Sequence, residues 1–198
     1  MLSVLACAAL AGCGAAGGPE RPGADVTLLL GERPGGVHAG IYLASERGFD
    51  EAEGIDLEIR RSGDPVKLLR SGRVQAVILG AAALPGIRAT CVMALTQTPR
   101  PSHFVCVLPT TLADRRPEVA ALVRTLQRGY SEAEIDPESA VQAILAGNGG
   151  LDRVALAAEL DAVSASFEAG VPAFGYLKAD GLPPGDFDRT LVGPTSRD

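Results

Sequence analysis

The feature that most constrains this fold is an alternation of strand-like and helix-like segments between residues 25 and 80. Residues 26–30, 55–59 and 74–80 are apolar or alternating runs of strand length. Between them, residues 39–48 have a helical pattern that ends at Gly48, and Asp64 followed by Pro65 marks the N-cap and first turn of a second helix. Strand, helix, strand, helix, strand at this short spacing predicts right-handed crossovers and three parallel strands.

The rest of the chain adds two strands and several helices to this unit. Residues 91–95 and 104–108 are strand-like, and the proline-broken segment 96–103 separates them. Apolar spacing then predicts helices beginning near Val119, Asp136 and Leu156. We therefore expect an α/β lobe over residues 25–178, with a mainly parallel central sheet flanked by helices, and an irregular tail over residues 179–198.

The N-terminal segment has the character of a targeting signal. Its apolar run is too short to span a bilayer and ends in Leu10-Ala11-Gly12-Cys13, which resembles a bacterial lipobox. This predicts a lipoprotein signal peptide over residues 1–13, a lipid on Cys13, a flexible linker over residues 14–24 and an extracytoplasmic, membrane-anchored protein. No Lys or Arg precedes the apolar run, and a chance cysteine in an apolar N-terminus remains the alternative.

Charge and cysteine spacing exclude two classes of partner. The net charge is −6 and the arginines are scattered, so the chain lacks the basic field of a nucleic-acid-binding protein. The cysteines do not have the paired spacing of a zinc site, and we expect no metal and no cofactor. Cys91 and Cys106 are expected to be core thiols and His103 a surface histidine, although the two cysteines could form a disulfide if their strands are neighbours.

A glycine-rich loop with a histidine follows the first predicted strand. Because loops after parallel strands gather at one edge of a sheet, residues 31–38 and 62–64 should lie side by side. Gly35 and Gly36 would let a ligand approach the backbone, and the helix starts favour a ligand that is anionic or accepts hydrogen bonds. His38 would point into this crevice, unless it only caps its own helix.

The same region resembles a known family. It is similar to the substrate-binding proteins of the thiamine-pyrimidine-precursor type (SsuA/THI5-like, NMT1-like), relatives of the sulfonate, taurine and nitrate binders of ABC importers. A second block, residues 104–145, is similar to a later segment of these proteins. The matching positions in the first block are Pro34, His38, Gly40, Tyr42, Gly48, Gly54, Asp56 and Glu58.

The resemblance implies a periplasmic-binding-protein type II-like fold and a lipoprotein that delivers a small thiamine-pyrimidine-precursor-like, or sulfonate- or nitrate-like, ligand to an ABC permease and ATPase. Family members have a second lobe between the two blocks, where this chain has only residues 96–103, so it is expected to have one lobe and low affinity. The chain also has Gly31-Glu32 where the family tends to have Asp-Trp. The expected ligand-binding residues are His38, Gly35, Gly36, Pro34, Tyr42, Gly63 and Asp64.

Two other functions remain open at this point. One is a degenerate, non-transport lipoprotein that acts as an interaction module and could form a homodimer. The other is a pyrimidine-synthase-like enzyme, which needs a Schiff-base lysine. The lysines are Lys67 and Lys178, and neither precedes His38, so we expect no catalytic residues and no enzyme activity.

Overall fold

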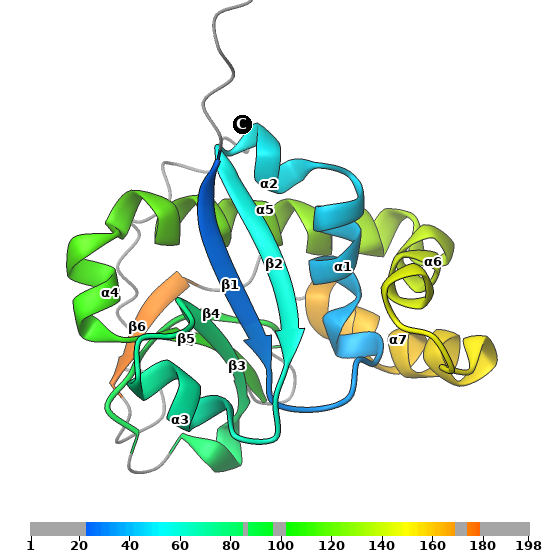
Figure 1. The fold of residues 1–198 in the computed structure, drawn as a ribbon. Helices are drawn as coiled ribbons and strands as arrows, with labels where there is room; N and C mark the ends of the chain where they lie inside the picture. Colours follow the sequence, from blue (N-terminus) through cyan, green and yellow to red (C-terminus); the bar gives the residue numbers. More distant parts are fainter. Residues whose placement is uncertain (1–22, 85–86, 97–101, 169–173, 179–198) are drawn as a thin grey trace, which may run out of the picture.

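The computed structural model describes residues 23–84, 87–96, 102–168 and 174–178. They form one six-stranded sheet in the order β2-β1-β3-β5-β4-β6, with helices on both faces (Figure 1). The strands are β1 (Ala24–Leu30), β2 (Ile55–Arg61), β3 (Ala76–Gly80), β4 (Thr90–Ala94), β5 (His103–Val107) and β6 (Phe174–Lys178). The helices are α1 (Ala39–Glu46), α2 (Phe49–Ala52), α3 (Pro65–Arg70), α4 (Pro109–Asp114), α5 (Arg116–Ile135), α6 (Pro137–Gly147) and α7 (Arg153–Glu168), with short 3-10 helices η1 (Gly36–His38) and η2 (Ala81–Ala83). The predicted α/β class is confirmed.

The three strands predicted from the alternation lie together and run parallel. β1 pairs with β2 on one side and with β3 on the other. The pairs β3–β5, β5–β4 and β4–β6 are antiparallel, so the sheet is mixed and the prediction of a mainly parallel sheet was wrong in this respect. The sequence analysis also missed β6, because a run as short as residues 174–178 carries too little periodicity to be recognised.

Side chains that alternate along β1 divide between two cores. Val26, Leu28 and Leu30 join the larger core, on the face covered by α1, α5, α6 and α7. Leu29 joins a second core on the opposite face, where Leu69 of α3 also lies. A strand that is buried on both faces needs a continuous apolar run, which explains the sequence of residues 26–30.

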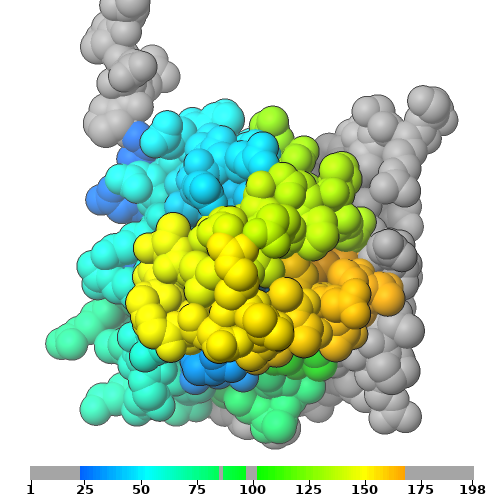
Figure 2. All heavy atoms as spheres, turned by 90° about the vertical axis from the view of Figure 1, so that its right-hand side faces the viewer, coloured from blue at the N-terminus to red at the C-terminus, as the bar shows by residue number. Residues whose placement is uncertain are grey.

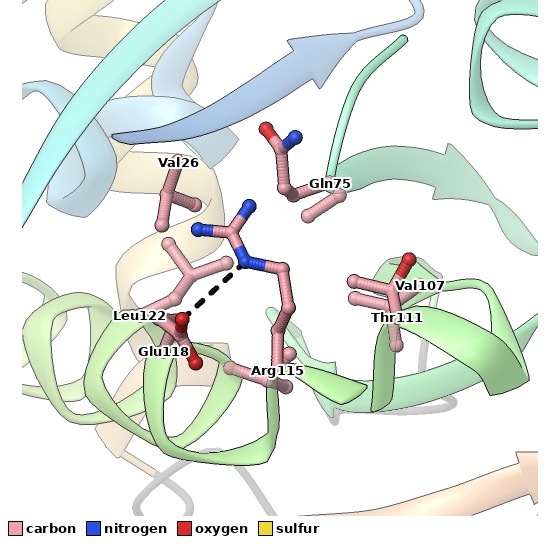
Figure 3. A pocket seen from close by; sticks show the side chains of 9 residues that line it. Val26, Gln75, Val107, Thr111, Arg115, Glu118 and Leu122 are labelled. Atoms are coloured by element: carbon pink, nitrogen blue, oxygen red, sulfur yellow. Dashed lines mark hydrogen bonds and ion pairs between the residues drawn. The ribbon is translucent and has the colours of Figure 1, made fainter. Parts of the chain in front are cut away.

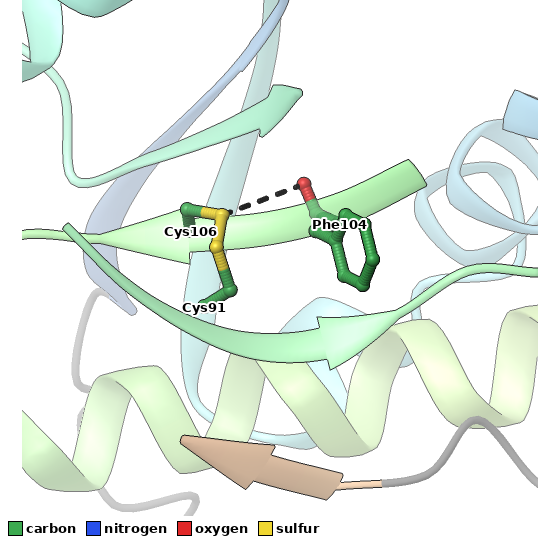
Figure 4. The surroundings of a disulfide bond; sticks show 3 residues. All are labelled: Cys91, Phe104 and Cys106. Atoms are coloured by element: carbon green, nitrogen blue, oxygen red, sulfur yellow. Dashed lines mark hydrogen bonds between the residues drawn. A yellow bond between two sulfur atoms is a disulfide. The ribbon is translucent and has the colours of Figure 1, made fainter. Parts of the chain in front are cut away.

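The second core contains a disulfide bond. Cys91 of β4 and Cys106 of β5 stand opposite each other in an antiparallel pair and are bonded (Figure 4). Both residues are buried. The structure thus shows the pairing that the sequence left open.

The packing of α1 on α5 depends on two glycines. A Cβ at Gly129 would overlap the carbonyl oxygen of Gly40, and a Cβ at Gly40 would lie 2.5 Å from Cγ of Tyr130. The buried Tyr130 hydroxyl donates to the carbonyl of Val37 at 2.5 Å, and its ring meets Phe167 of α7 edge to face. These contacts attach η1 firmly to the helical layer.

Candidate functional site

The loops after β1 and β2 meet at the carboxyl edge of the parallel strands, as predicted. The amide of Ser62 donates to the carbonyl of Leu30 at 3.2 Å, and a Cβ at Gly31 would lie 3.2 Å from the Pro65 ring. Because β5 runs antiparallel to β3, its first residue, His103, stands opposite Gly80 at this same edge. Three segments that are distant in the sequence therefore converge here.

His38 ends η1 and is almost completely buried, with 1% of its surface exposed. Its Nδ1 accepts a hydrogen bond from the amide of Gly35 at 3.2 Å. Its Nε2 has no hydrogen-bond partner among the described residues, and the nearest carboxylate oxygen, Oε1 of Glu32, is 3.8 Å away. The helix-capping role considered from the sequence is thus real, but it uses only one of the two ring nitrogens.

Glu32 and His103 form the other half of this cluster. Nε2 of His103 lies 2.9 Å from Oε1 of Glu32, and Nδ1 of His103 lies 2.8 Å from Oγ of Ser102. That hydroxyl is 2.6 Å from Oγ1 of Thr96. These contacts fix the His103 ring and hold the Glu32 carboxylate beside Nε2 of His38.

His103 was expected to be a surface histidine and was not predicted as a site residue. His103 begins a strand that returns alongside β3, and the first residue of such a strand must lie at the carboxyl edge of β3. The sequence would have predicted this position of His103 only if β5 had been recognised as antiparallel to β3. The chain's two histidines lie with their ring centroids 6.5 Å apart.

The buried environment keeps His38 neutral. The pKa of His38 is lowered to about 4, chiefly by burial and in smaller part by the nearby His103. A neutral imidazole carries one proton, and Nδ1 must be free of it to accept from Gly35. His38 therefore presents an N–H donor at Nε2.

This tautomer also argues against metal binding. Nε2 could bind a metal only if the proton moved to Nδ1, where it would face the N–H of Gly35. Among the residues that the structure describes, no cluster of three or more His, Cys, Asp or Glu side chains could hold a metal ion.

The glycine turn before η1 is not open to a ligand. Pro34, Gly35 and Gly36 are all buried. The amide of Gly35 is used by His38, and the amide of Gly36 donates to Oε2 of Glu159 at 3.1 Å. The expectation that these amides face a crevice was wrong, because α7 lies across the turn (Figure 2).

Tyr42 lies in a different place from His38. Its hydroxyl is 3.5 Å from Oδ1 of Asn148, and burial raises its pKa. It lines a groove of about 390 Å³ between β2, α1 and the end of α6, together with Arg61 and Asn148. The structure thus separates Tyr42 from the cluster of His38, Glu32 and His103.

Gly63 and Asp64 are exposed in the loop after β2. Oδ1 of Asp64 accepts from the amide of Lys67 at 3.0 Å, so the predicted N-cap of α3 is confirmed. A Cβ at Gly63 would meet nothing within 4 Å. Their role in ligand binding stays a prediction. Cys13 lies outside the described residues.

A small pocket beside β1 and β3 does not have room for a solute. It is lined by residues that include Val26, Gln75 and Arg115 (Figure 3) and measures about 10 Å³. That volume is about the size needed for one water molecule.

No helix in the described ranges is long and apolar enough to cross a membrane.

The comparisons with known proteins agree with this architecture. The family model described as NMT1/THI5 like matches residues 36–106, which run from η1 to β5. No curated protein matches the sequence.

Solved structures share the fold. The Candida albicans CA3427 gene product, described as exhibiting the generic periplasmic binding protein fold, superposes with a TM-score of 0.51 at 10% identity, covering 78% of this chain and 82% of that chain. The alkanesulfonate-binding protein SsuA from Xanthomonas axonopodis pv. citri, bound to MOPS, gives 0.54 at 9% identity, covering 80% and 89%. A protein from Bordetella bronchiseptica RB50 gives 0.51 at 11% identity, covering 87% and 88%. The family match over residues 36–106 and the shared periplasmic-binding-protein fold both agree with the resemblance seen in the sequence.

Proposed function

We propose that this protein binds a small neutral aminopyrimidine, of the thiamine-pyrimidine-precursor type, against His38, Glu32 and His103. The observation that carries the proposal is the buried Nε2–H of His38, which lacks a partner among the described residues and lies 3.8 Å from a carboxylate oxygen. A donor beside an acceptor matches an aminopyrimidine edge, whose ring nitrogen accepts and whose amino group donates. To admit such a ligand, the half-exposed Glu32 carboxylate would exchange its contact with His103 for one with the ligand.

The same geometry disfavours a sulfonate or nitrate. SsuA, with the same fold, was solved with the sulfonate MOPS. In this chain the Glu32 carboxylate stands at the site, and the Gly36 amide is already bonded to Glu159. An anionic ligand would meet a like charge and would find this amide occupied.

The wider role in the proposal follows the family resemblance. The protein would be a lipoprotein, anchored through Cys13 outside the cytoplasm, that delivers its ligand to an ABC permease and ATPase. A single lobe encloses less of a ligand than a closed two-lobed pocket does, so the affinity should be low. A non-transport interaction module is the second candidate.

Calorimetric titration with 4-amino-5-hydroxymethyl-2-methylpyrimidine tests the proposal. We expect binding, and we expect His38→Ala to weaken it about tenfold or more, because a hydrogen bond to a buried donor is worth roughly 1–3 kcal/mol. Glu32→Gln should weaken binding of the aminopyrimidine. It should strengthen binding of MOPS, because the carboxylate that repels the sulfonate is removed. Tyr42→Phe, in the separate groove, should change neither affinity.

Three outcomes would contradict the proposal. Equal affinity in His38→Ala would remove His38 from the site. Binding of a matched pyrimidine without the amino group as tightly as the aminopyrimidine would remove the role of Glu32. No response to any ligand, together with a molecular mass that rises with protein concentration, would favour the interaction module.

A further inference from the structure

The glycine turn before His38 holds a carboxylate that the chain itself supplies. Oε2 of Glu159, on α7, accepts from the amide of Gly36 at 3.1 Å, and Oε1 accepts from Nη2 of Arg33 at 2.7 Å. An amide and a guanidinium that converge on one carboxylate form an anion-binding cradle. An external ligand was predicted at this turn, and the structure places Glu159 there instead.

The glycine turn packs closely against α7 and leaves no room for a side chain at Gly36. A Cβ at Gly36 would overlap the backbone of Glu159 and Leu160, and a Cβ at Gly35 would overlap the Glu159 carboxylate. Gly36 therefore requires glycine for the approach of this helix, whereas at Gly35 the overlapping atom is the end of a flexible side chain. In Figure 2 the yellow helix α7 crosses this face of the molecule directly against the blue loop.

The cradle is connected to His38 by a short path. Gly36 is the first residue of η1 and His38 the last, and the amide of Gly35 donates to Nδ1 of His38. The hydroxyl of Tyr130 holds the carbonyl of Val37 between them. If the turn is released, the amide of Gly35 loses its fixed direction and Nδ1 loses its donor.

We infer that Glu159 is a positioning residue for the solute site: by holding the turn through Gly36, it keeps Nδ1 of His38 as an acceptor and so leaves the proton on Nε2, where the ligand binds. The ligand part rests on the proposed function, whereas the tautomer part concerns the free protein alone. The polar partners of Glu159 among the described residues are Gly36 and Arg33, so its effect on His38 would pass through the turn.

Nitrogen-15 NMR of the imidazole in the free full-length chain tests this inference. The wild-type protein should show the Nε2–H tautomer of His38. Glu159→Ala should give a mixture of the two neutral tautomers of His38, because Nδ1 loses its fixed donor. Asp161→Asn is the matched control, since Asp161 is an exposed carboxylate on the same helix, and it should leave the His38 signals unchanged.

Chemical rescue separates positioning from general helix packing. Formate added to Glu159→Ala should occupy the cradle of the Gly36 amide and Arg33 and restore the wild-type tautomer, and it should have no effect on the wild-type protein. If Glu159→Ala does not fold, Glu159→Leu takes its place, since it keeps much of the side-chain volume and cannot accept from the amide of Gly36.

Unchanged His38 signals in a folded Glu159 variant, or equal changes in Asp161→Asn, would overturn the inference. Failure of formate to restore the tautomer would also count against it. The tautomer measurement needs no solute, so it stands even if the aminopyrimidine does not bind. If both the tautomer inference and the proposed aminopyrimidine site are correct, Glu159→Ala should weaken aminopyrimidine binding about tenfold, whereas Asp161→Asn should not weaken it.

Discussion

Acid should destabilise this protein through His38 in a defined pH window. The pKa of this imidazole is about 4 in the folded protein and 6.5 in an unfolded chain. Between these values the unfolded chain binds a proton that the folded protein does not, so the free energy of unfolding falls as the pH falls. The full stability is present above about pH 6.5, and the loss is complete below about pH 4.

The size of the loss follows from the shift. Each pKa unit corresponds to about 1.4 kcal/mol, so protonation of His38 should remove about 3 kcal/mol between about pH 7 and about pH 4. That is a large fraction of the stability of a typical domain, about 5–15 kcal/mol. Little discount for solvent screening applies, because only 1% of the residue is exposed.

Urea unfolding followed by circular dichroism at several pH values measures this loss. Gln at position 38 does not titrate in this window. Between about pH 7 and about pH 4, the free energy of unfolding of His38→Gln should therefore fall by about 3 kcal/mol less than that of the wild-type protein. A direct NMR titration of His38 in the wild-type protein gives the folded pKa independently. A midpoint near 6.5, or an equal acid slope in His38→Gln, would refute the burial argument.

Two further predictions concern the packing. Gly129→Ala places a methyl group against the carbonyl of Gly40 and should destabilise the protein by about 1–3 kcal/mol, whereas Gly149→Ala, with nothing within 4 Å, should not; equal melting temperatures of the two variants would contradict the close helix contact. Reduction of the Cys91–Cys106 disulfide, which spans 15 residues, should cost about 3 kcal/mol, and thiol labelling in dithiothreitol should be slow until the protein unfolds because both cysteines are buried. Rapid labelling of the folded protein would show that they are accessible.

The parallel half of the sheet was readable from the sequence because its signals are local. The apolar run at residues 26–30, the Asp64-Pro65 helix start and the spacing between strands are each contained in a few residues. The order and direction of β5, β4 and β6 depend on pairing between segments that are distant in the sequence. A pattern within a few residues cannot predict such pairing. The mixed character of the sheet was therefore not predictable in the same way.

The part of the site that depends on local sequence was predicted, and the part that depends on long-range contacts was not. His38 could be placed at the carboxyl edge from its own loop, and the structure confirms that edge. Glu159 and His103 come from α7 and β5, so their arrival beside residues 32–38 required the tertiary fold. The glycine pair was misassigned to a ligand because a close approach of α7 and a close approach of a solute require the same small residues.

Under the proposed function, the arrangement around His38 would supply affinity without enclosure by a second lobe. In water, a donor must lose its own hydration before it can bind a ligand, and that cost cancels most of the gain from the new hydrogen bond. The Nε2–H of His38 has already lost its hydration during folding and has no partner among the described residues, so a ligand acceptor gains nearly the full bond. Binding would then relieve a cost built into the folded state, and this contribution does not depend on enclosure by a second lobe. It requires only that the turn held by Glu159 keeps the imidazole in one tautomer.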